Sequence, residues 1–545
     1  MEASLPTWKV AALERRQRQL SLIPQEWRLK TIPSAAEAKC TFPIVESCGI
    51  LSPFELEITN PSNSAPYILS NIHNSTWTAY DVTLAFCKRA AVVQQLTSCL
   101  TEIFFDKALA QAKELDEIFQ KTGKPIGPLH GLPISLKDSQ AVQGVESTNG
   151  WLARVGKPAA KDHPSVATYR KLGAVLYVKT NIPQSTMMCD SYNHLFGQSV
   201  NSLNRHLISG GSSGGEGALI GSGGSVLGIG TDVGGSIRVP ATLQGLYGLC
   251  PTIGRIGNRD SVRWQANIIP PVAGPIARDL DSIEYFLKSY LSSQPWKSDP
   301  AVMPIPWREN LVDEITSQSK KLKIGYIVDD GAVLPQPPVQ RAVLEIVEKL
   351  KAAGHQVVPW GASSHAKGTD MWIKAILSEG GRDAAEMNKL GHGEPLIPGM
   401  LTGTAETYLD ADQRQSLGDE IFDYQDEYQA RWEASKLDAL ILPVTQWVGL
   451  RPKAWVQADM YIGYTAIFNL LNWTAFTVPA TTVSKDKDRP SQAWKDHKAR
   501  SFSDRFNHDY YDVDLFDGMP VGVQVVTGRF GEEKAIGIAK VLRSL

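Results

Sequence analysis

Residues 210–240 read GGSSGGEGALIGSGGSVLGIGTDVGGSIRVP. Each glycine loses extra backbone entropy when the chain folds, so glycine at this density needs a structural reason. A flexible linker is one alternative, but a linker would lack the apolar runs at residues 218–220 and 226–227. We interpret the stretch as a packed loop whose backbone N–H groups converge on an anion.

The kind of anion can be narrowed from the residues around the glycines. A phosphate loop would need the pattern G-x-x-x-x-G-K-[ST], which is missing, and Gly228, Gly230 and Gly234 miss the dinucleotide-binding spacing by one residue. An oxyanion fits better, because serine hydroxyls stand beside the glycines. Gly234, Gly235 and Ser236 can turn successive N–H groups toward one point.

A nucleophile elbow of the α/β-hydrolase type is a second alternative. Residues 210–214 match its G-x-S-x-G pattern, but that elbow follows an apolar strand. Here residues 201–207 are polar and turn-like, and no downstream Asp/His pair stands out. We interpret this match as accidental.

Upstream, residues 131–138 read GLPISLKD and place Lys137 at the end of a predicted buried strand. Serine needs an adjacent base, and a lysine serves only when neutral, which requires a pKa lowered from about 10.4 toward about 7–8. We expect burial beside Ile134 and Leu136 to lower the pKa, with Asp138 facing the other side of the strand.

A serine placed between base and nucleophile can relay a proton, because a hydroxyl is both donor and acceptor. Ser–Lys pairs are a known variant of the catalytic triad. Structural alternatives remain for each residue. Lys137 could be a surface charge, Ser212 and Ser213 could cap a helix, Asp232 could be a turn residue and Arg238 a surface cation.

Three segments together resemble the amidase signature family: GLPISLKD at 131–138, GGSSGG at 210–215 and GIGTDVGGSIR at 228–238. The likeness extends over most of the chain, including residues 178–197 and 520–524. In its sequence pattern the chain is most similar to fungal acetamidases and general amidases, and more distantly similar to fatty acid amide hydrolases.

The resemblance implies a role for each matching residue. Lys137 would be the general base, Ser212 the bridging serine held with a cis peptide, and Ser236 the nucleophile. Backbone amides would form the oxyanion hole, namely those of Val233, Gly234, Gly235 and Ser236. Four further residues would supply supporting hydrogen bonds: Ser213, Thr231, Asp232 and Arg238. Met187 and Cys189, with Trp151 and Met188, are candidates for the substrate pocket or for simple core.

The pattern along the chain predicts an α/β fold. Helix–glycine–strand units recur at 166–178 and 342–358, and further strands are expected at 323–328, 439–442, 475–478 and 521–526. Thr78 and Asp81 have capping-box spacing before a helix that reaches about residue 97, and a second helix is predicted near 106–120. The charged residues 484–512 suggest a surface loop.

We predict a helical and loop extension at residues 1–75, followed by a single large α/β domain at 76–545 with its catalytic core near 128–260. The resemblance implies a twisted mixed sheet with helices on both faces, and a homo-oligomer.

Composition excludes several classes of protein. The chain has 545 residues, with 55 basic and 57 acidic side chains, so no electropositive field favours nucleic acid. No signal peptide and no apolar run of membrane-spanning length is visible, which favours a cytoplasmic protein that does not enter a membrane. Six cysteines without a C-x-x-C pair and ten histidines without H-x-x-x-H spacing predict no metal and no cofactor.

The sequence therefore predicts a serine hydrolase that cleaves small to medium amides to a carboxylate and ammonia or an amine through an acyl-enzyme. Carbamate (urethane) or ester hydrolysis on the same three residues remains an alternative. So does an amidotransferase subunit that acts in a complex, and so does a binding protein with a degenerate site.

Overall fold

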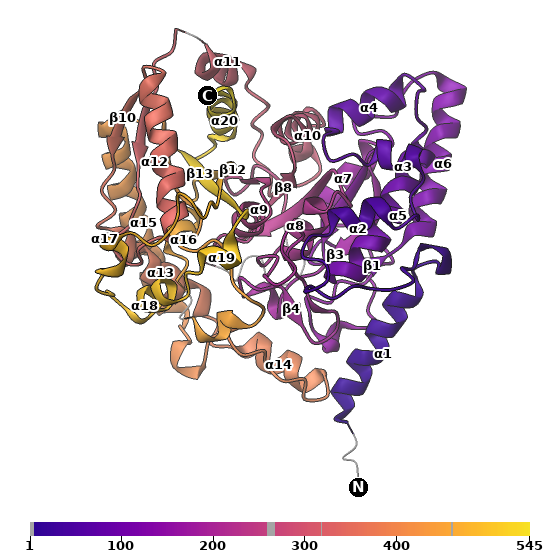
Figure 1. Cartoon of the computed structure of the whole chain (residues 1–545), viewed down its shortest axis with the longest axis horizontal. Coiled ribbons are helices and arrows are strands. Elements are labelled where there is room, and N and C mark those ends of the chain that lie inside the picture. Colours follow the sequence, from indigo (N-terminus) through magenta and orange to yellow (C-terminus); the bar gives the residue numbers. More distant parts are fainter. Residues whose placement is uncertain (1–4, 259–267, 318, 459–460) are drawn as a thin grey trace.

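The computed structural model describes residues 5–258, 268–317, 319–458 and 461–545. Its centre is a mixed sheet of 11 strands (Figure 1). In spatial order the strands are β1 (Leu100–Ile103), β3 (Val175–Thr180), β2 (Pro133–Lys137), β6 (Leu227–Asp232), β8 (Val272–Ala277), β7 (Tyr247–Cys250), β12 (Thr474–Thr482), β13 (Pro520–Gly528), β11 (Ala439–Pro443), β9 (Lys323–Tyr326) and β10 (Gln356–Pro359). A separate two-stranded sheet joins β4 (Tyr192–Asn193) and β5 (Gly197–Gln198).

Parallel and antiparallel pairs alternate in blocks across this sheet. β3, β2 and β6 run parallel, as do β11, β9 and β10, while the strands between β6 and β11 pair antiparallel. The parallel pair β2 and β6 carries the predicted catalytic segments side by side. The predicted mixed sheet, and the strands expected near 134, 175, 323, 439, 475 and 521, are confirmed.

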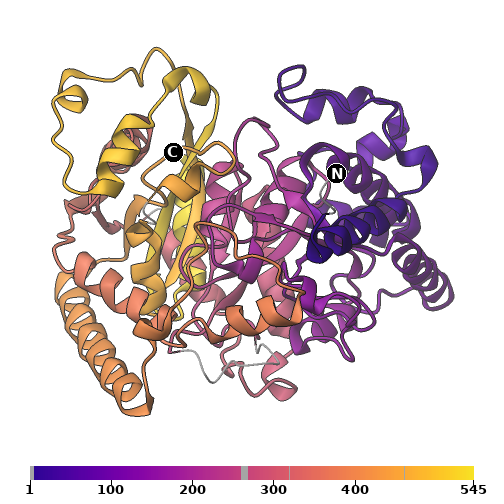
Figure 2. The same ribbon diagram turned by 90° about the horizontal axis from the view of Figure 1, so that it is seen from below.

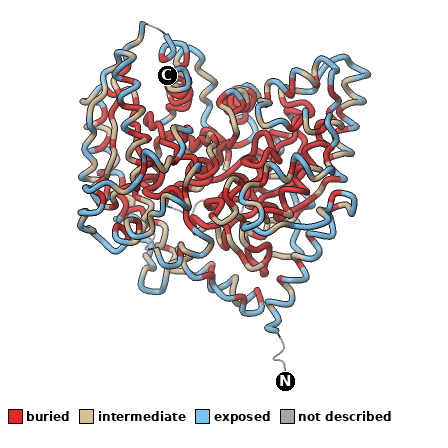
Figure 3. Tube along the Cα trace, in the orientation of Figure 1, coloured by how far each residue is buried: buried red, intermediate tan, exposed pale blue. Residues whose placement is uncertain are grey.

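Helices cover both faces of the sheet, because successive strand residues point to opposite sides. On β11, Ile441 belongs to one hydrophobic cluster while Leu440 and Leu442 belong to another. The first cluster packs under α10 (Leu280–Ser292), α12 (Pro337–Ala352) and α20 (Glu532–Ser544), and the second under α13 (His365–Leu377), α15 (Ala411–Ser435) and α16 (Gly463–Leu470). Figure 3 shows the buried residues concentrated along this central layer.

Helices from the first quarter of the chain gather on one side of the molecule (Figures 1 and 2). They are α1 (Thr7–Ser21), α2 (Phe42–Ser47), α3 (Pro53–Ile58), α4 (Ala65–His73), α5 (Ala79–Thr97) and α6 (Phe105–Thr122). The predicted capping box of α5 is confirmed: the Thr78 hydroxyl accepts from the Asp81 amide at 2.9 Å, and the Asp81 carboxylate accepts from the Thr78 amide at 3.3 Å.

The remaining helices are mostly short: α7 (Pro164–Lys171), α8 (Gly214–Gly221), α9 (Arg238–Leu243), α11 (Glu309–Thr316), α14 (Arg382–Leu390), α17 (Gln492–Lys495), α18 (Phe502–Asp509) and α19 (Val513–Phe516). The prediction of a plain surface loop at 484–512 was wrong in part. Ser491 and Ser501 cap α17 and α18 through their side chains, and Trp494 is buried against His508 with ring centroids 4.8 Å apart. Local side-chain caps therefore outweigh the charged composition.

Candidate active site

The glycine-rich stretch folds as a loop, helix α8, strand β6 and a second loop. Its glycines allow α8 to lie directly against the sheet. A Cβ on Gly215 would stand 2.2 Å from the Asn181 nitrogen, and one on Gly228 would stand 2.0 Å from Glu216 Oε2. Atoms cannot approach so closely, so the packing itself requires glycine. The interpretation as a packed segment instead of a linker is confirmed.

Lys137 ends strand β2 with its side chain fully buried. Its Nζ lies 2.7 Å from Ser212 Oγ, 2.7 Å from Thr231 Oγ1 and 3.3 Å from the Thr231 carbonyl oxygen. The parallel pairing of β2 with β6 places Thr231 beside the lysine, although 94 residues separate the two in sequence. The structure thus brings together three of the predicted site residues.

Burial lowers the pKa of Lys137 from 10.5 to about 7, although the charges of Asp232, Glu216 and Asp138 each act to raise it. Desolvation penalises the ammonium form, so a neutral amine is available near neutral pH. The Asp138 carboxylate is engaged elsewhere, accepting from the Asn149 amide at 2.7 Å. An amine in this state can accept a proton from a neighbouring hydroxyl.

The source of that burial differs from the sequence-based expectation. Ile134 and Leu136 belong to the hydrophobic cluster on the other face of β2, so they do not cover Lys137. Ser135 shares the lysine's face, and its hydroxyl donates to Glu216 Oε2 at 2.6 Å. Helix α8, which carries Glu216, is therefore part of the cover over the lysine.

Glu216 is a second buried titratable group at this face, which the sequence reasoning did not single out. Its Oε1 accepts from Thr180 Oγ1 at 3.0 Å, and burial raises its pKa to about 7. Its side chain projects from the first turn of α8 onto strands β2 and β3. The one sequence feature that could have pointed to Glu216 is its position directly after two glycines, Gly214 and Gly215.

Ser212 and Ser213 follow a cis peptide between Gly211 and Ser212, as the resemblance implied. Ser213 occupies the N-cap position of α8, but its side chain makes no capping hydrogen bond. Instead its hydroxyl donates to the Thr231 carbonyl and accepts from the Thr231 amide, both at 3.3 Å. Ser213 therefore ties the serine loop to the end of β6.

Ser236 follows Gly235, whose φ of +127° favours glycine. It is half-buried, and it lines the same cavity as Ser212 and Thr231. Its carbonyl accepts from the Ser213 amide at 3.1 Å, which joins the two serine loops, and its hydroxyl forms no hydrogen bond with any described residue.

The four amides predicted for the oxyanion hole are not equivalent. The Gly235 N–H donates to Asp232 Oδ1 at 2.8 Å, so it is engaged inside the protein. The amides of Val233, Gly234 and Ser236 have no acceptor within the described part of the chain. These three remain the candidates for stabilising an oxyanion. The sequence could have suggested this contact, because Asp232 stands three residues before Gly235 and aspartate side chains often accept from nearby backbone amides.

Asp232 and Arg238 form a fully buried ion pair at the two ends of the loop of residues 232–238, called the Ser236 loop below. Burial alone would raise the pKa of Asp232, but the Arg238 charge and its hydrogen bonds hold that pKa below its ordinary value. Arg238 also donates to Asn469 Oδ1 at 2.6 Å and to Gln524 Oε1 at 3.0 Å. The pair anchors the loop to α16 and β13, so Arg238 is no surface cation.

The cavity in front of these residues has a volume of about 380 Å³. Its apolar wall comprises Met187, Val233, Ile268, Ile269, Ala375, Ile376, Ala384, Met387 and Leu401. Charged and titratable side chains also line it: Arg154, His163, Glu379, Asp383 and Glu386. Met187 lines this cavity, whereas Cys189 packs with Trp151 and Met188 in a hydrophobic cluster and is not among the lining residues.

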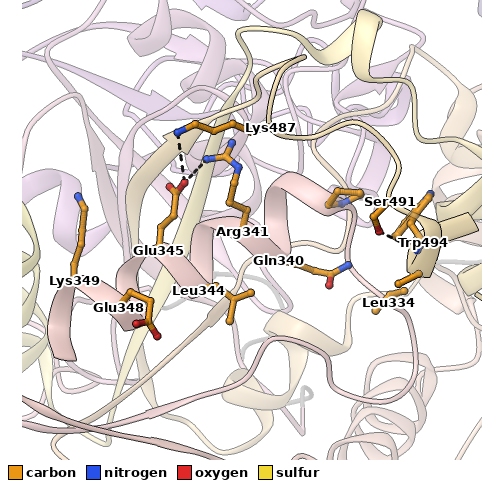
Figure 4. A pocket seen from close by; sticks show the side chains of 12 residues that line it. Leu334, Gln340, Arg341, Leu344, Glu345, Glu348, Lys349, Lys487, Ser491 and Trp494 are labelled. Carbon is orange, nitrogen blue, oxygen red and sulfur yellow. Dashed lines mark hydrogen bonds and ion pairs between the residues drawn. The ribbon is translucent and has the colours of Figure 1, made fainter. Parts of the chain in front are cut away.

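A larger hollow of about 890 Å³ lies on the surface along α12 (Figure 4). Its charged side chains neutralise one another, since Glu345 accepts from Arg341 at 2.8 Å and lies 4.0 Å from Lys487. Its serine, Ser491, caps α17. No nucleophile among its lining residues stands beside a base, so the smaller cavity is the candidate active site.

The described residues offer neither a metal centre nor a membrane-spanning helix. Among them, no group of three or more His, Cys, Asp or Glu side chains is arranged to hold a metal ion. None of the described helices is both long enough and apolar enough to cross a membrane.

Two side chains that contact the Ser236 loop could not be found from the sequence. Trp372 donates from Nε1 to the Val233 carbonyl at 2.8 Å, and Thr465 donates from Oγ1 to the Gly234 carbonyl at 2.5 Å. Both lie in segments without a recognisable motif, more than 130 residues along the chain. Tertiary folding alone creates these contacts.

Comparison with known proteins adds an independent observation. Residues 81–536 match the family model named Amidase. An acetamidase of Emericella nidulans is 40% identical over 99% of this chain and 98% of its own length, and an acetamidase of Aspergillus oryzae is 38% identical over 99% of each. Among solved structures, a fatty acid amide hydrolase superposes with a TM-score of 0.91 at 30% identity, covering 99% of this chain and 95% of that one.

Proposed function

Because this chain belongs to the amidase family and is therefore an amide hydrolase, we propose that it cleaves small to medium amides through Ser236, Ser212 and Lys137. One observation carries the proposal: a buried lysine with a pKa near 7 lies 2.7 Å from a serine hydroxyl. A neutral amine in that position can draw a proton through Ser212.

In the acylation step, Ser236 Oγ attacks the amide carbonyl carbon. The Ser236 proton passes to Ser212, whose own proton passes to Lys137 Nζ. The amides of Val233, Gly234 and Ser236 stabilise the resulting oxyanion, a type of contact whose loss costs about 10²–10³ in kcat. The same relay returns a proton to the leaving nitrogen, the C–N bond breaks, and ammonia or an amine departs.

In the deacylation step, water attacks the acyl carbon while Lys137, through Ser212, accepts a proton. The bond to Ser236 Oγ breaks, the serine recovers its proton, and a carboxylic acid leaves. No step of this scheme calls on a metal or a cofactor.

Cavity size and lining support the substrate class. A volume of about 380 Å³ lies at the lower end of ligand pockets, and the wall formed by Met187, Ile268, Ile376 and Leu401 suits a short aliphatic acyl chain. Two relatives are named acetamidase and a structural neighbour is named fatty acid amide hydrolase. The length of the substrate's acyl chain is therefore the property to measure.

The test is a panel of primary amides from acetamide to hexanamide, ethyl carbamate, a short ester and an 18-carbon amide in micelles. We expect the highest kcat/KM among the short amides, with no turnover by Ser236→Ala. A fluorophosphonate should label Ser236, detected by peptide mass analysis. Preference for the 18-carbon amide would overturn the substrate class, and labelling of Ser212 would overturn the assignment of the nucleophile.

A further inference from the structure

Two side chains from the second half of the chain hold consecutive carbonyl groups of the Ser236 loop (residues 232–238). Trp372, on α13, donates from its indole nitrogen to the Val233 carbonyl at 2.8 Å. Thr465, on α16, donates from its hydroxyl to the Gly234 carbonyl at 2.5 Å. Neither residue lines the substrate cavity.

Holding a carbonyl fixes the direction of the next amide. In a trans peptide the C=O and N–H bonds are coplanar and point in opposite directions. Trp372 is only 2% exposed and lies outside the cavity lining, so its hold on the Val233 carbonyl turns the Gly234 N–H away from the indole. The Gly234 amide is one of the three without an internal acceptor.

The next peptide follows the same rule. The Thr465 contact turns the Gly235 N–H in the opposite direction, where it meets Asp232 Oδ1 at 2.8 Å. Each of the two peptide planes is therefore defined at its carbonyl end by a side chain from a distant helix.

Close packing reinforces these contacts. A Cβ on Gly234 would stand 2.6 Å from Trp372 Cζ2, and a Cβ on Gly235 would stand 2.6 Å from Thr465 Oγ1. Gly234 and Gly235 thus leave room for the Trp372 and Thr465 side chains. A larger residue at either position would move the loop away from these two donors.

We propose that Trp372 and Thr465 are positioning residues for the oxyanion hole. Trp372 orients the peptide that carries the Gly234 N–H, and Thr465 fixes the next peptide, which lies between the Gly234 and Ser236 amides. The inference rests on the proposed amide hydrolysis. Their hydrogen bonds fix the peptide planes before substrate binds, which is the condition for strong oxyanion stabilisation. Since neither side chain lines the cavity, their loss should affect kcat much more than KM.

The experiment compares Trp372→Phe, Thr465→Val and Thr465→Ser with wild type on one short amide. Thr465→Val removes the donor and keeps the shape of the side chain, whereas Trp372→Phe removes the donor together with one ring, a truncation that the Trp360→Phe control reproduces. We expect kcat to fall roughly 10–100-fold in each, a part of the loss seen when an oxyanion donor is deleted, with KM within about twofold. Thr465→Ser keeps the hydroxyl and should recover most of kcat.

A second readout separates positioning from general loss of structure. An aldehyde or boronic acid that forms a tetrahedral adduct on serine should bind more weakly in step with kcat/KM, while the carboxylate product should bind as in wild type. Trp360→Phe is the matched control, since its indole donates to Tyr428 Oη at 3.0 Å, away from the loop. It should leave kcat unchanged.

The outcomes are distinct. If wild type cleaves no amide, the proposed function fails. If wild type is active and folded Trp372→Phe and Thr465→Val retain kcat within twofold, or if they lose no more than Trp360→Phe, the positioning role is overturned. Loss of product binding equal to the loss of adduct binding would also overturn it, because that pattern indicates a distorted cavity.

Discussion

The pKa values of Lys137 and Glu216 converge on about 7 from opposite directions, because burial lowers the first and raises the second. Both groups are fully buried, and the Glu216 charge acts to raise the pKa of the lysine. Two groups that titrate in the same pH range at one site make the pH dependence of the reaction the most informative measurement.

Catalysis should follow deprotonation of Lys137. Because its pKa is lowered to about 7, kcat/KM on a short amide should rise through pH 7 and then level off. Lys137→Ala should lower kcat/KM by about 10²–10⁴ and abolish the rise, since the general base is gone. The check is a pH profile of both proteins with circular dichroism as a folding control. A folded mutant with wild-type turnover would show that another residue is the base.

Removing the Glu216 charge should move that profile. Glu216→Gln eliminates a charge that raises the pKa of Lys137, so the acidic limb should shift to lower pH while the plateau changes by no more than a few fold. Glu394→Gln is the matched control, because Glu394 is also buried with a pKa raised to about 7 but does not act on Lys137. An unmoved limb in Glu216→Gln, or an equal shift in both variants, would contradict the coupling.

The buried lysine should also affect stability in a pH-dependent way. Between about pH 7 and 10.5 the unfolded chain binds a proton at Lys137 that the folded protein does not, so wild type gains stability as pH rises. Lys137→Met carries no such group. The Tm of Lys137→Met minus the Tm of wild type should therefore be largest below pH 7 and should decrease toward pH 10. Thermal scans of both proteins at several pH values measure this difference. A difference that stays constant across that range would contradict the shifted pKa.

The Asp232–Arg238 pair should contribute far more than a surface pair. Arg238→Met leaves the Asp232 carboxylate buried without its partner, which costs about 3–5 kcal/mol. The control is Arg543→Met, since Arg543 pairs with Asp281 where both side chains are largely solvated, and such pairs contribute about 0–1 kcal/mol. Chemical denaturation of both variants compares the costs, and equal losses would contradict the anchoring role.

Short sequence patterns predicted the helices and strands well, because caps, turns and hydrophobic periodicity depend on residues that are close in sequence. The Thr78–Asp81 capping box needed only neighbouring residues. Lys137, Ser212 and Ser236 were predicted because three short segments match a family pattern. Their mutual geometry was not derivable, since it depends on the pairing of β2 with β6.

Contacts made across the molecule escaped prediction. Trp372 and Thr465 reach the loop only after α13 and α16 pack on the sheet, and nothing in their own segments marks them. The role given to Ile134 and Leu136 was wrong because strand alternation places them on the other face. Of the two alternatives given for Cys189, substrate pocket or simple core, its place in a hydrophobic cluster matches the core.

Strand β13 lies inside the sheet, between β12 and β11, although it comes near the end of the chain. Its Gln524 donates to the Pro443 and Tyr464 carbonyls and accepts from Arg238. During synthesis, Lys137, Ser212 and Ser236 leave the ribosome long before residue 520, yet the sheet stays split until this strand arrives. The nascent chain must therefore be kept from aggregating with two open strand edges, and a premature stop codon even near the end removes an interior strand instead of a dispensable tail.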